Sequence, residues 1–295
     1  MPEEDFIIAV FCLVEDVIKA MKLSRLRTKG PSPALYDSEV IAMEIVGEFI
    51  GYQEDKGIWR YFLTHWKGLF PKIPCRTTFV RQAANLWYVK QLIQTVLARC
   101  LGAESDNIHI VDGFPLPVCA FRRARGSKLF KEHAQYGHCA SKGQTYFGFR
   151  GLVCTSFEGV ITGITLTAAN IDERDALWDV TDSFKGLLLG DKGFISFLLK
   201  QDLSKVHVDL QTPLRSNMLD NRSPSFVKSL TRKRRLIETV ISQLTCRFDI
   251  ENTKARDLWH LTNRITRKIL SHTVAIFFNK MLGNPPLQFA RLQLS

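Results

Sequence analysis

The stretch GLLLGDKGF, residues 186–194, places a single carboxylate directly after a short apolar run. Lys192 and two glycines, Gly190 and Gly193, surround that carboxylate, which belongs to Asp191. A buried strand needs no acid at its end, whereas a metal site does. We therefore take Asp191 as a candidate metal ligand and ask whether the rest of the sequence supplies partners for it.

Composition predicts an ordinary globular protein. The chain has 295 residues, of which 45% are hydrophobic, enough for one large domain or two of average size. Its longest apolar runs are shorter than the roughly 18–20 residues of a membrane span. The acidic start MPEEDF differs from the basic start of a secretory signal. We expect a soluble intracellular protein without a membrane partner.

The seven cysteines are scattered and never spaced as Cys-x-x-Cys, which predicts reduced thiols. The nearest approach to a zinc motif is the group His133, His138 and Cys139. Two adjacent residues are poor joint ligands, and a second ligand pair is missing, so the spacing argues against zinc.

Positive charge is concentrated in the later part of the chain. The formal net charge is +11, of which residues 1–103 contribute +2 and residues 104–295 contribute +9. A clustered basic excess favours a polyanionic partner over a merely basic surface.

Apolar spacing predicts that the first hundred residues are all helical. We expect helices over 3–25, from Asp37 or Ser38 onward, within 57–70, and over 75–102 with Thr77 or Thr78 as the cap. Residues 25–33 contain one glycine and two prolines and predict a loop. Arg76 and Arg81, on the last of these helices, are available for DNA phosphates.

From residue 107 the pattern changes to that of an α/β domain with a mixed sheet. A β-branched run ends at Asp112 and leads into turn residues, and two further strands are joined at Glu158–Gly159. Helices and strands then alternate, with helices expected over 172–184 and 195–203, strands over 186–191 and 206–213, and two closing helices over 231–248 and 257–282. The last helix is amphipathic, and we expect it to pack against the sheet. Trp259, at its start, is the tryptophan least readily assigned to the core.

Three carboxylates suit a magnesium or manganese site in this layout. Asp112 and Asp191 end strands at the sheet edge where ligands bind in α/β folds, and Glu238 lies on a later helix that can reach the same edge. Oxygen ligands suit Mg²⁺ or Mn²⁺, and two such ions can promote phosphodiester displacement. The same residues also have plainer interpretations, because an Asp after a strand often caps a turn and a Glu in a basic run often forms a surface ion pair.

The order of the blocks VDGFPLPVC, TYFGFRGLV, GDKGF and RRLIETVISQL resembles that of DDE-type transposases of bacterial insertion sequences, over about residues 105–280. The resemblance implies a ribonuclease H-like catalytic domain with Asp112, Asp191 and Glu238 as a catalytic, metal-binding triad, 79 and 47 residues apart. It further implies Mg²⁺, replaceable by Mn²⁺, with two ions bound. Many relatives have Tyr and Lys around the last acid, where this chain has Thr231 and Thr245, while Arg234 matches. In relatives these side chains contact DNA phosphates near the element end, and here Lys233, Arg235 or Arg247 can take their place.

Two basic runs bracket the expected metal site, and together with Lys192 they form the predicted DNA-binding set. Its members are Arg122, Arg123, Arg125, Lys128, Lys131, Lys192, Lys228, Arg232, Lys233, Arg234 and Arg235. Phosphate neutralisation by such side chains supplies most non-specific DNA affinity. On a helix, Lys228, Arg232 and Arg235 share one side.

These observations predict a helical N-terminal domain (1–103), a catalytic domain with C-terminal helices (104–283) and a tail (284–295). The N-terminal domain either recognises element ends or dimerises. The predicted function is metal-dependent cleavage at the terminal inverted repeats of an insertion sequence and strand transfer into target DNA. Partners are double-stranded DNA and a second copy of the chain, in the bacterial cytoplasm at the nucleoid. Two alternatives stay open, a nuclease of the same fold and a DNA-binding regulator without catalysis.

Overall fold

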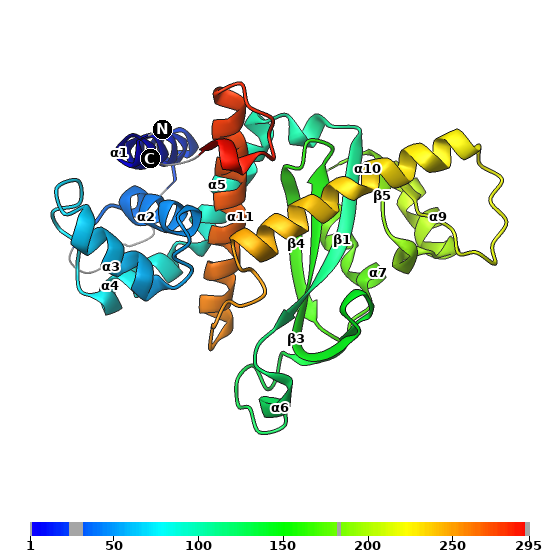
Figure 1. The fold of residues 1–295 in the computed structure, drawn as a ribbon, viewed down its shortest axis with the longest axis horizontal. Coiled ribbons are helices and arrows are strands. Elements are labelled where there is room, and N and C mark those ends of the chain that lie inside the picture. Colours follow the sequence, from blue (N-terminus) through cyan, green and yellow to red (C-terminus); the bar gives the residue numbers. More distant parts are fainter. Residues whose placement is uncertain (1, 24–31, 182–183, 293–295) are drawn as a thin grey trace. The chain divides into compact units, whose positions relative to one another are not determined.

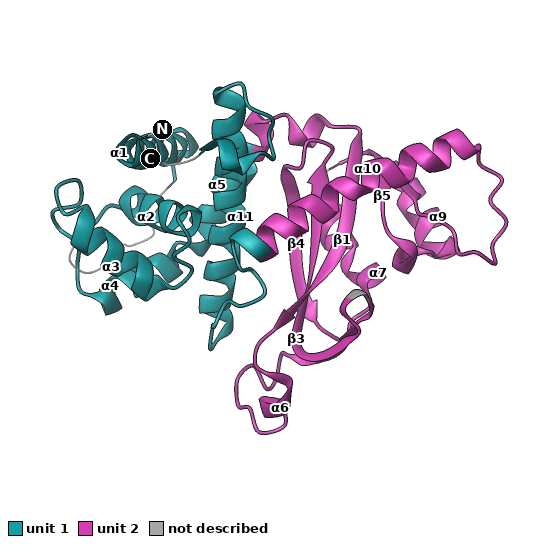
Figure 2. Cartoon of the chain, viewed as in Figure 1, with its two compact units in different colours: residues 1–97, 246–295 teal, residues 98–245 magenta. Residues whose placement is uncertain are grey.

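The computed structural model describes residues 2–23, 32–181 and 184–292, so the loop predicted over 25–33 lies largely outside the described residues. The chain folds into two compact units, one of residues 1–97 with 246–295 and one of residues 98–245 (Figure 2). The first unit is helical, and the second contains the sheet (Figure 1). None of the helices in the described ranges is long and apolar enough to cross a membrane.

The helical unit confirms the all-helical prediction for the described part of the first hundred residues. Its elements are α1 (Glu3–Met21), α2 (Asp37–Phe49), α3 (Asp55–His65), α4 (Arg76–Asn85), most of α5 (Trp87–Cys100), α11 (Leu258–Met281) and the 3₁₀ turn η5 (Phe289–Leu292). The helix predicted over 75–102 is two helices, and Cys75 rather than a threonine is its N-cap. The break falls at Leu86, and the carbonyl of Ala83 accepts a hydrogen bond from buried Lys90 at 3.1 Å.

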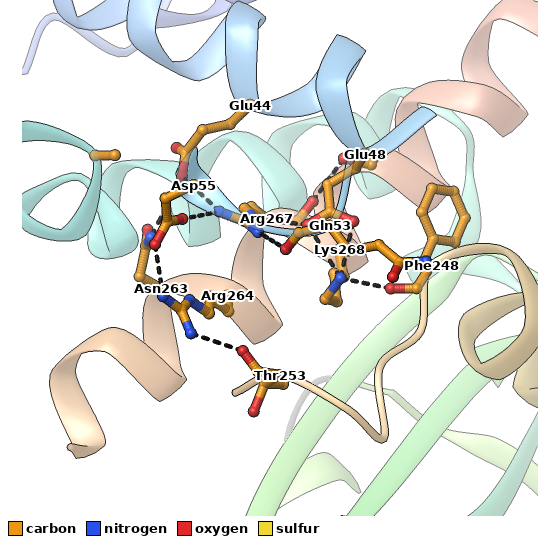
Figure 3. A network of polar contacts seen from close by, with 12 residues as sticks. Glu44, Glu48, Gln53, Asp55, Phe248, Thr253, Asn263, Arg264, Arg267 and Lys268 are labelled. Atoms are coloured by element: carbon orange, nitrogen blue, oxygen red, sulfur yellow. Dashed lines mark hydrogen bonds and ion pairs between the residues drawn. The ribbon is translucent and has the colours of Figure 1, made fainter. Parts of the chain in front are cut away.

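Helix α11 packs on α2 and α4 within the helical unit, which corrects the expectation that it packs on the sheet. A buried ionic network joins α11 to α2 and to Asp55 at the start of α3 (Figure 3). Arg267, fully buried, pairs with Glu48 at 2.5 Å and also with Asp55, while Lys268 pairs with Glu48 at 2.8 Å. Lys90 pairs with Glu44, which is also buried. The polar face of α11 is therefore an interior face, and the C-terminal helix belongs with the N-terminal ones.

The sheet unit contains six strands in the order β2-β3-β1-β5-β6, with β4 also paired to β3. The strands are β1 (Ile108–Pro117), β2 (Gln135–Cys139), β3 (Gln144–Ser156), β4 (Ile161–Ala168), β5 (Gly186–Leu189) and β6 (Val208–Gln211). β1, β5 and β6 run parallel, whereas β3 is antiparallel to β1, β2 and β4. The predicted hairpin at Glu158–Gly159 and the mixed sheet are both confirmed; β2 was not predicted.

Helices follow the strands as expected, with changes in detail. They are α6 (Phe121–Ala124), α7 (Glu173–Ala176), α8 (Trp178–Thr181), α9 (Phe197–Lys205) and α10 (Pro224–Ser242), the last followed by a π turn at Gln243–Arg247. The helix predicted over 172–184 is the pair α7 and α8, and residues 182–183 lie outside the described residues. α10 starts earlier than predicted, because Ser223 caps it and Pro224 occupies its first turn.

Apolar side chains of the central strands fix the sheet in place. Leu188 and Leu189 of β5 are fully buried, and Val111 and Phe194 lie in the same core. Helix α10 contacts β1 in this unit (Figure 1). The short strand β5 thus has the buried character that its apolar run predicted, and it carries the chain directly to Asp191.

Candidate active site

Asp112 lies in the middle of β1, not at the end of a strand as expected from the sequence. β1 continues to Pro117 in register with β3, whereas its parallel partner β5 pairs only as far as Ile110. Val118 donates its N–H to Phe147 on β3, so Pro115 and Pro117, at the alternate positions, turn their missing N–H toward the side without a strand. Asp112 therefore lies just beyond the end of the parallel pairing, which is still the sheet edge where ligands bind.

Asp191 lies two residues beyond the end of β5, which stops at Leu189 and not at Asp191 as expected. Its carboxylate accepts a hydrogen bond from the N–H of Gly193 at 2.5 Å and caps the 3₁₀ turn Lys192–Phe194. The fully buried Phe194 ring leaves no room for a side chain at Gly190, because a Cβ there would lie 2.9 Å from the ring. The apolar strand, the glycine and the buried ring together hold the Asp191 backbone in position.

Glu238 projects from α10, which packs against β1. Arg234, one turn earlier, joins this helix to the strand. Its guanidinium donates to Glu238 at 3.0 Å and lies 3.6 Å from the Asp112 carboxylate. The side chain of Glu238 is 55% exposed, whereas those of Arg234 and Asp112 are each 22% exposed. Arg234 thus links the first and third predicted acids.

The electrostatics of Asp112 connect all three acids. Burial raises the pKa of Asp112 to about 6, and the negative charges of Asp191 and Glu238 add to the rise. The Gly113 N–H, which donates to Asp112 at 2.9 Å, and Arg234 both lower the pKa, but by less. Asp191 and Glu238 therefore both lie close enough to Asp112 to raise the pKa of its carboxyl.

Glu173, at the start of α7, is a fourth carboxylate at this edge, and the sequence alone did not single it out. Burial raises its pKa, against the effect of Arg150, and the charges of Asp191 and Asp112 raise it further. In the sequence it stands in DERDA, where an acid in the first turn of a helix is ordinary. Only the folding of α7 onto the turn that follows Asp191 brings it to the site.

Comparison with known proteins supports this architecture. Residues 102–258, more than half of the chain, match the family model described as a transposase DDE domain. The chain belongs to the DDE transposase family. A solved structure, a piggyBac transposase synaptic complex with hairpin DNA, is similar over 96% of this chain and 76% of that chain. The TM-score is 0.50 at 9% identity, so this likeness concerns the ribonuclease H-like fold alone. No curated protein matches the sequence.

The donor set of this DDE domain fits a magnesium-type ion by chemistry. All four side chains offer carboxylate oxygens, the ligands that Mg²⁺ and Mn²⁺ prefer. Across the described ranges, no three Asp, Glu, His or Cys side chains form a ready-made metal cage. Mg²⁺ needs no such cage, because it keeps several waters and is usually held by one or two carboxylates together with substrate phosphates.

The predicted DNA-binding residues of the DDE domain fall into two exposed groups. Residues 122–131, around α6, carry the five side chains Arg122, Arg123, Arg125, Lys128 and Lys131, all exposed. On α10, Lys228, Arg232 and Arg235 are exposed, and Lys192 beside Asp191 is exposed as well. Lys233 lies 5.0 Å from the Phe157 ring centroid, and Arg234 contacts the acids. Lys233 and Arg234 are thus partly engaged within the protein.

The helical unit contains a pocket of about 510 Å³ with a basic lining. Arg76 and Arg81 of α4, Lys56 of α3 and Trp259 of α11 contribute to it. Its two acids are already paired, Glu54 with Lys254 at 2.6 Å and Asp55 with Arg264 at 2.6 Å. Within the described residues, by contrast, Lys56, Arg76 and Arg81 have no carboxylate at ion-pair distance. The fold thus brings together the two arginines and the tryptophan that the sequence analysis noted separately.

Proposed function

We propose that this chain is a DNA transposase that cleaves the ends of an insertion sequence and joins them to target DNA. The observation that carries the proposal is the set Asp112, Asp191 and Glu238 in a chain of the DDE family. The three acids come from β1, the end of β5 and α10, and the pKa of Asp112 responds to both others. Acids so arranged are suited to phosphodiester chemistry on a divalent ion.

In this proposal Asp112, Asp191 and Glu238 would hold two Mg²⁺ ions, with Mn²⁺ as a substitute. Such ions, when bound, activate the attacking water or hydroxyl and stabilise the leaving oxygen. We take Asp112 as the central ligand, because the charges of both Asp191 and Glu238 raise the pKa of its carboxyl. Glu238 completes the set from α10, and its exposure leaves its carboxylate accessible from solvent.

Arg234 has a positioning role in the proposed reaction. It bridges Glu238 and Asp112, so it holds the carboxylate of α10 toward β1 before DNA arrives. Thr231, which stands where many relatives have Tyr, bonds its hydroxyl to the Val227 carbonyl of its own helix at 3.0 Å. The Thr231 hydroxyl is thus engaged within its own helix, and we assign the phosphate contacts to the exposed basic side chains of α10.

DNA is the proposed partner of both units. The exposed basic groups of residues 122–131 and α10 suit phosphate contacts beside the acids. The pocket with Arg76, Arg81 and Trp259 suits a second stretch of the same DNA, with phosphates on the arginines and an aromatic side chain beside them. Pairing of two element ends requires at least a homodimer.

The test is cleavage and strand transfer on duplexes carrying the element's terminal inverted repeats, with Mg²⁺ or Mn²⁺. We expect joined products from the wild-type protein and none from Asp191→Ala, while both proteins bind the duplex. Asp202→Ala, which removes an acid from the exposed end of α9, is the matched control and keeps activity.

Two results would point to the alternatives. Cutting without joining would favour a nuclease of the same fold. DNA binding by the wild-type protein without cutting or joining, under either metal, would favour a DNA-binding regulator. The loss of catalysis would then agree with Thr231 and Thr245, which stand where many relatives have Tyr and Lys.

A further inference from the structure

Glu173 occupies a space that two glycines leave open. A Cβ built on Gly113 would lie 2.7 Å from Oε1 of Glu173, closer than real side chains approach. A Cβ built on Gly193 would lie 3.6 Å from Oε2 of Glu173 and 2.9 Å from Oδ1 of Asp191. Gly113 directly follows Asp112, and Gly193 follows Asp191 by two residues. The Glu173 carboxylate therefore lies between the backbone segments that carry the first two acids.

The position of Glu173 is fixed by its own helix. Asp172 accepts a hydrogen bond from the Arg174 N–H and caps α7, so the backbone at Glu173 is set by its neighbour. α7 contacts the 3₁₀ turn Lys192–Phe194 that follows Asp191. The side chain of Glu173 is 26% exposed, similar to the 22% of Asp112. A group from solvent therefore has comparable access to both carboxylates.

The ion pair between Glu173 and Arg150 is long, and Arg150 divides its contacts between two partners. The Arg150 Nε lies 3.5 Å from Oε1 of Glu173, longer than the roughly 2.7–2.9 Å of a charge-assisted hydrogen bond. Arg150 also donates to the carbonyl of Ile171 at 3.1 Å, so it has another partner.

The charge balance at the site calls for a cation. Four carboxylates, those of Asp112, Glu173, Asp191 and Glu238, face two guanidinium groups, those of Arg150 and Arg234. Partly buried charges of like sign are unfavourable unless a counter-charge is present. A divalent ion bound among these carboxylates would supply that counter-charge.

We propose that Glu173 is a further metal ligand of the active site, acting together with Asp112 and Asp191. This inference rests on the proposed function, since it takes the metal of a DDE transposase as the ligand. It adds to the predicted triad a fourth carboxylate, drawn from the helix that follows the β3–β4 hairpin.

The experiment is Mn²⁺ binding to the metal-free full-length chain without DNA, by calorimetry and by the loss of the free Mn²⁺ paramagnetic resonance signal. The variants are Glu173→Gln, which removes the charge at nearly constant size, and Glu173→Asp, which keeps the charge but shortens its reach. Asp172→Asn is the matched control, because it removes the same charge one residue away and its side-chain oxygen still caps α7. Asp191→Asn tests whether the Mn²⁺ that is measured binds at the proposed metal site.

We expect Glu173→Gln to weaken Mn²⁺ binding by at least about tenfold, the loss that even an outer partner of a metal typically causes. Glu173→Asp should also bind more weakly than wild type, because a ligand depends on reach whereas a background charge does not. Asp172→Asn should bind like wild type. Far-ultraviolet circular dichroism checks that each variant is folded, and if Glu173→Gln is not, the Glu173→Asp result decides.

The inference is overturned if Asp191→Asn loses binding while Glu173→Gln and Glu173→Asp bind as wild type does. That pattern would leave the triad intact and assign Glu173 to structure alone. If the wild-type chain binds no Mn²⁺, or Asp191→Asn binds as well as wild type, the proposed metal site fails and the role of Glu173 fails with it. The two failures are therefore distinguishable.

Discussion

At the scale of single residues, the site is recognisable where local sequence dictates local structure. Asp191 could be predicted because an apolar run and two glycines specify a buried strand followed by a tight turn. Asp112 could be found from the sequence, but the length of its strand could not. Pro115 and Pro117 indicate a turn after Asp112, whereas β1 continues through them because β5 leaves that side of β1 unpaired. Glu173 could not be found, since nothing in DERDA indicates that α7 folds toward Asp191. Residues whose role depends on a distant segment escape local reasoning.

The raised pKa of Asp112 predicts a stability change in Asp112→Asn. A folded-state pKa of about 6, above the ordinary value of 3.8, means that the folded protein holds this proton more tightly than the unfolded chain does. Stability from Asp112 is thus fully present below about pH 4 and is lost as the pH rises through about 6. Without divalent metal at pH 8, Asp112→Asn should raise the free energy of unfolding by about 1–3 kcal/mol.

Urea unfolding at pH 8 and pH 4, with chelator present, measures this effect. The gain should be much smaller at pH 4, where the folded protein holds the proton of Asp112 and the carboxyl of the unfolded chain, close to its ordinary pKa of 3.8, is about half protonated. Asp202→Asn, on exposed α9, should change little at either pH. An equal gain at both pH values would mean that packing, and not charge, causes the difference.

At the scale of elements, the periodicity of apolar residues predicts that a helix is present more readily than it predicts which elements the helix packs against. The spacing of Leu261, Ile265 and Ile269 predicts α11 correctly, yet it says nothing of what the helix packs against. The polar residues between them suggest a solvated face, whereas Arg267 and Lys268 are buried against acids of α2. Similarly, Arg76 and Trp259 are 183 residues apart in sequence, and only the packing of α11 on α4 places them around one pocket.

We expect the basic pocket of the helical unit to contribute to DNA affinity. Replacing Arg81 with Ala removes a cation that has no acidic partner in the described residues, so the loss should fall on DNA and not on folding. Each phosphate contact steepens the dependence of log affinity on log salt by about 0.9, so Arg81→Ala should reduce the slope by about that amount. Fluorescence anisotropy of a labelled duplex at several salt concentrations measures the slope.

Lys19→Ala is the control for this prediction, since it removes one positive charge from α1, outside the pocket, where Lys19 pairs with Glu15 at 3.1 Å. Its slope should match the wild type. An unchanged slope in Arg81→Ala and in Arg76→Ala would remove the pocket from the DNA-binding surface and leave the sheet unit as the sole site of contact.

At the scale of the whole molecule, the chain returns to its first unit after completing the second. Residues 246–295 supply Arg267 and Lys268, and the acids that they pair with, Glu44, Glu48 and Asp55, come from the first 97 residues (Figure 3). Desolvated charges of this kind are tolerated only when paired. The helical unit is therefore incomplete until the last part of the chain has been made, and both ends of the sequence are needed for it.

This dependence predicts that Arg267→Met destabilises the helical unit strongly, although methionine is a good helix former of similar reach. The substitution leaves Glu48 and Asp55 buried with fewer partners, and loss of one member of a buried ion pair costs about 3–5 kcal/mol. Lys19→Met, which breaks the exposed pair with Glu15, should cost less than about 1 kcal/mol. Urea unfolding followed by tryptophan fluorescence suits the measurement, because four of the five tryptophans, Trp59, Trp66, Trp87 and Trp259, belong to the helical unit. If Arg267→Met unfolds at the same urea concentration as Lys19→Met, the ionic network contributes no stability beyond apolar packing. The packing of the C-terminal helix on the N-terminal helices would then depend on the hydrophobic contacts of α11 with α2 and α4.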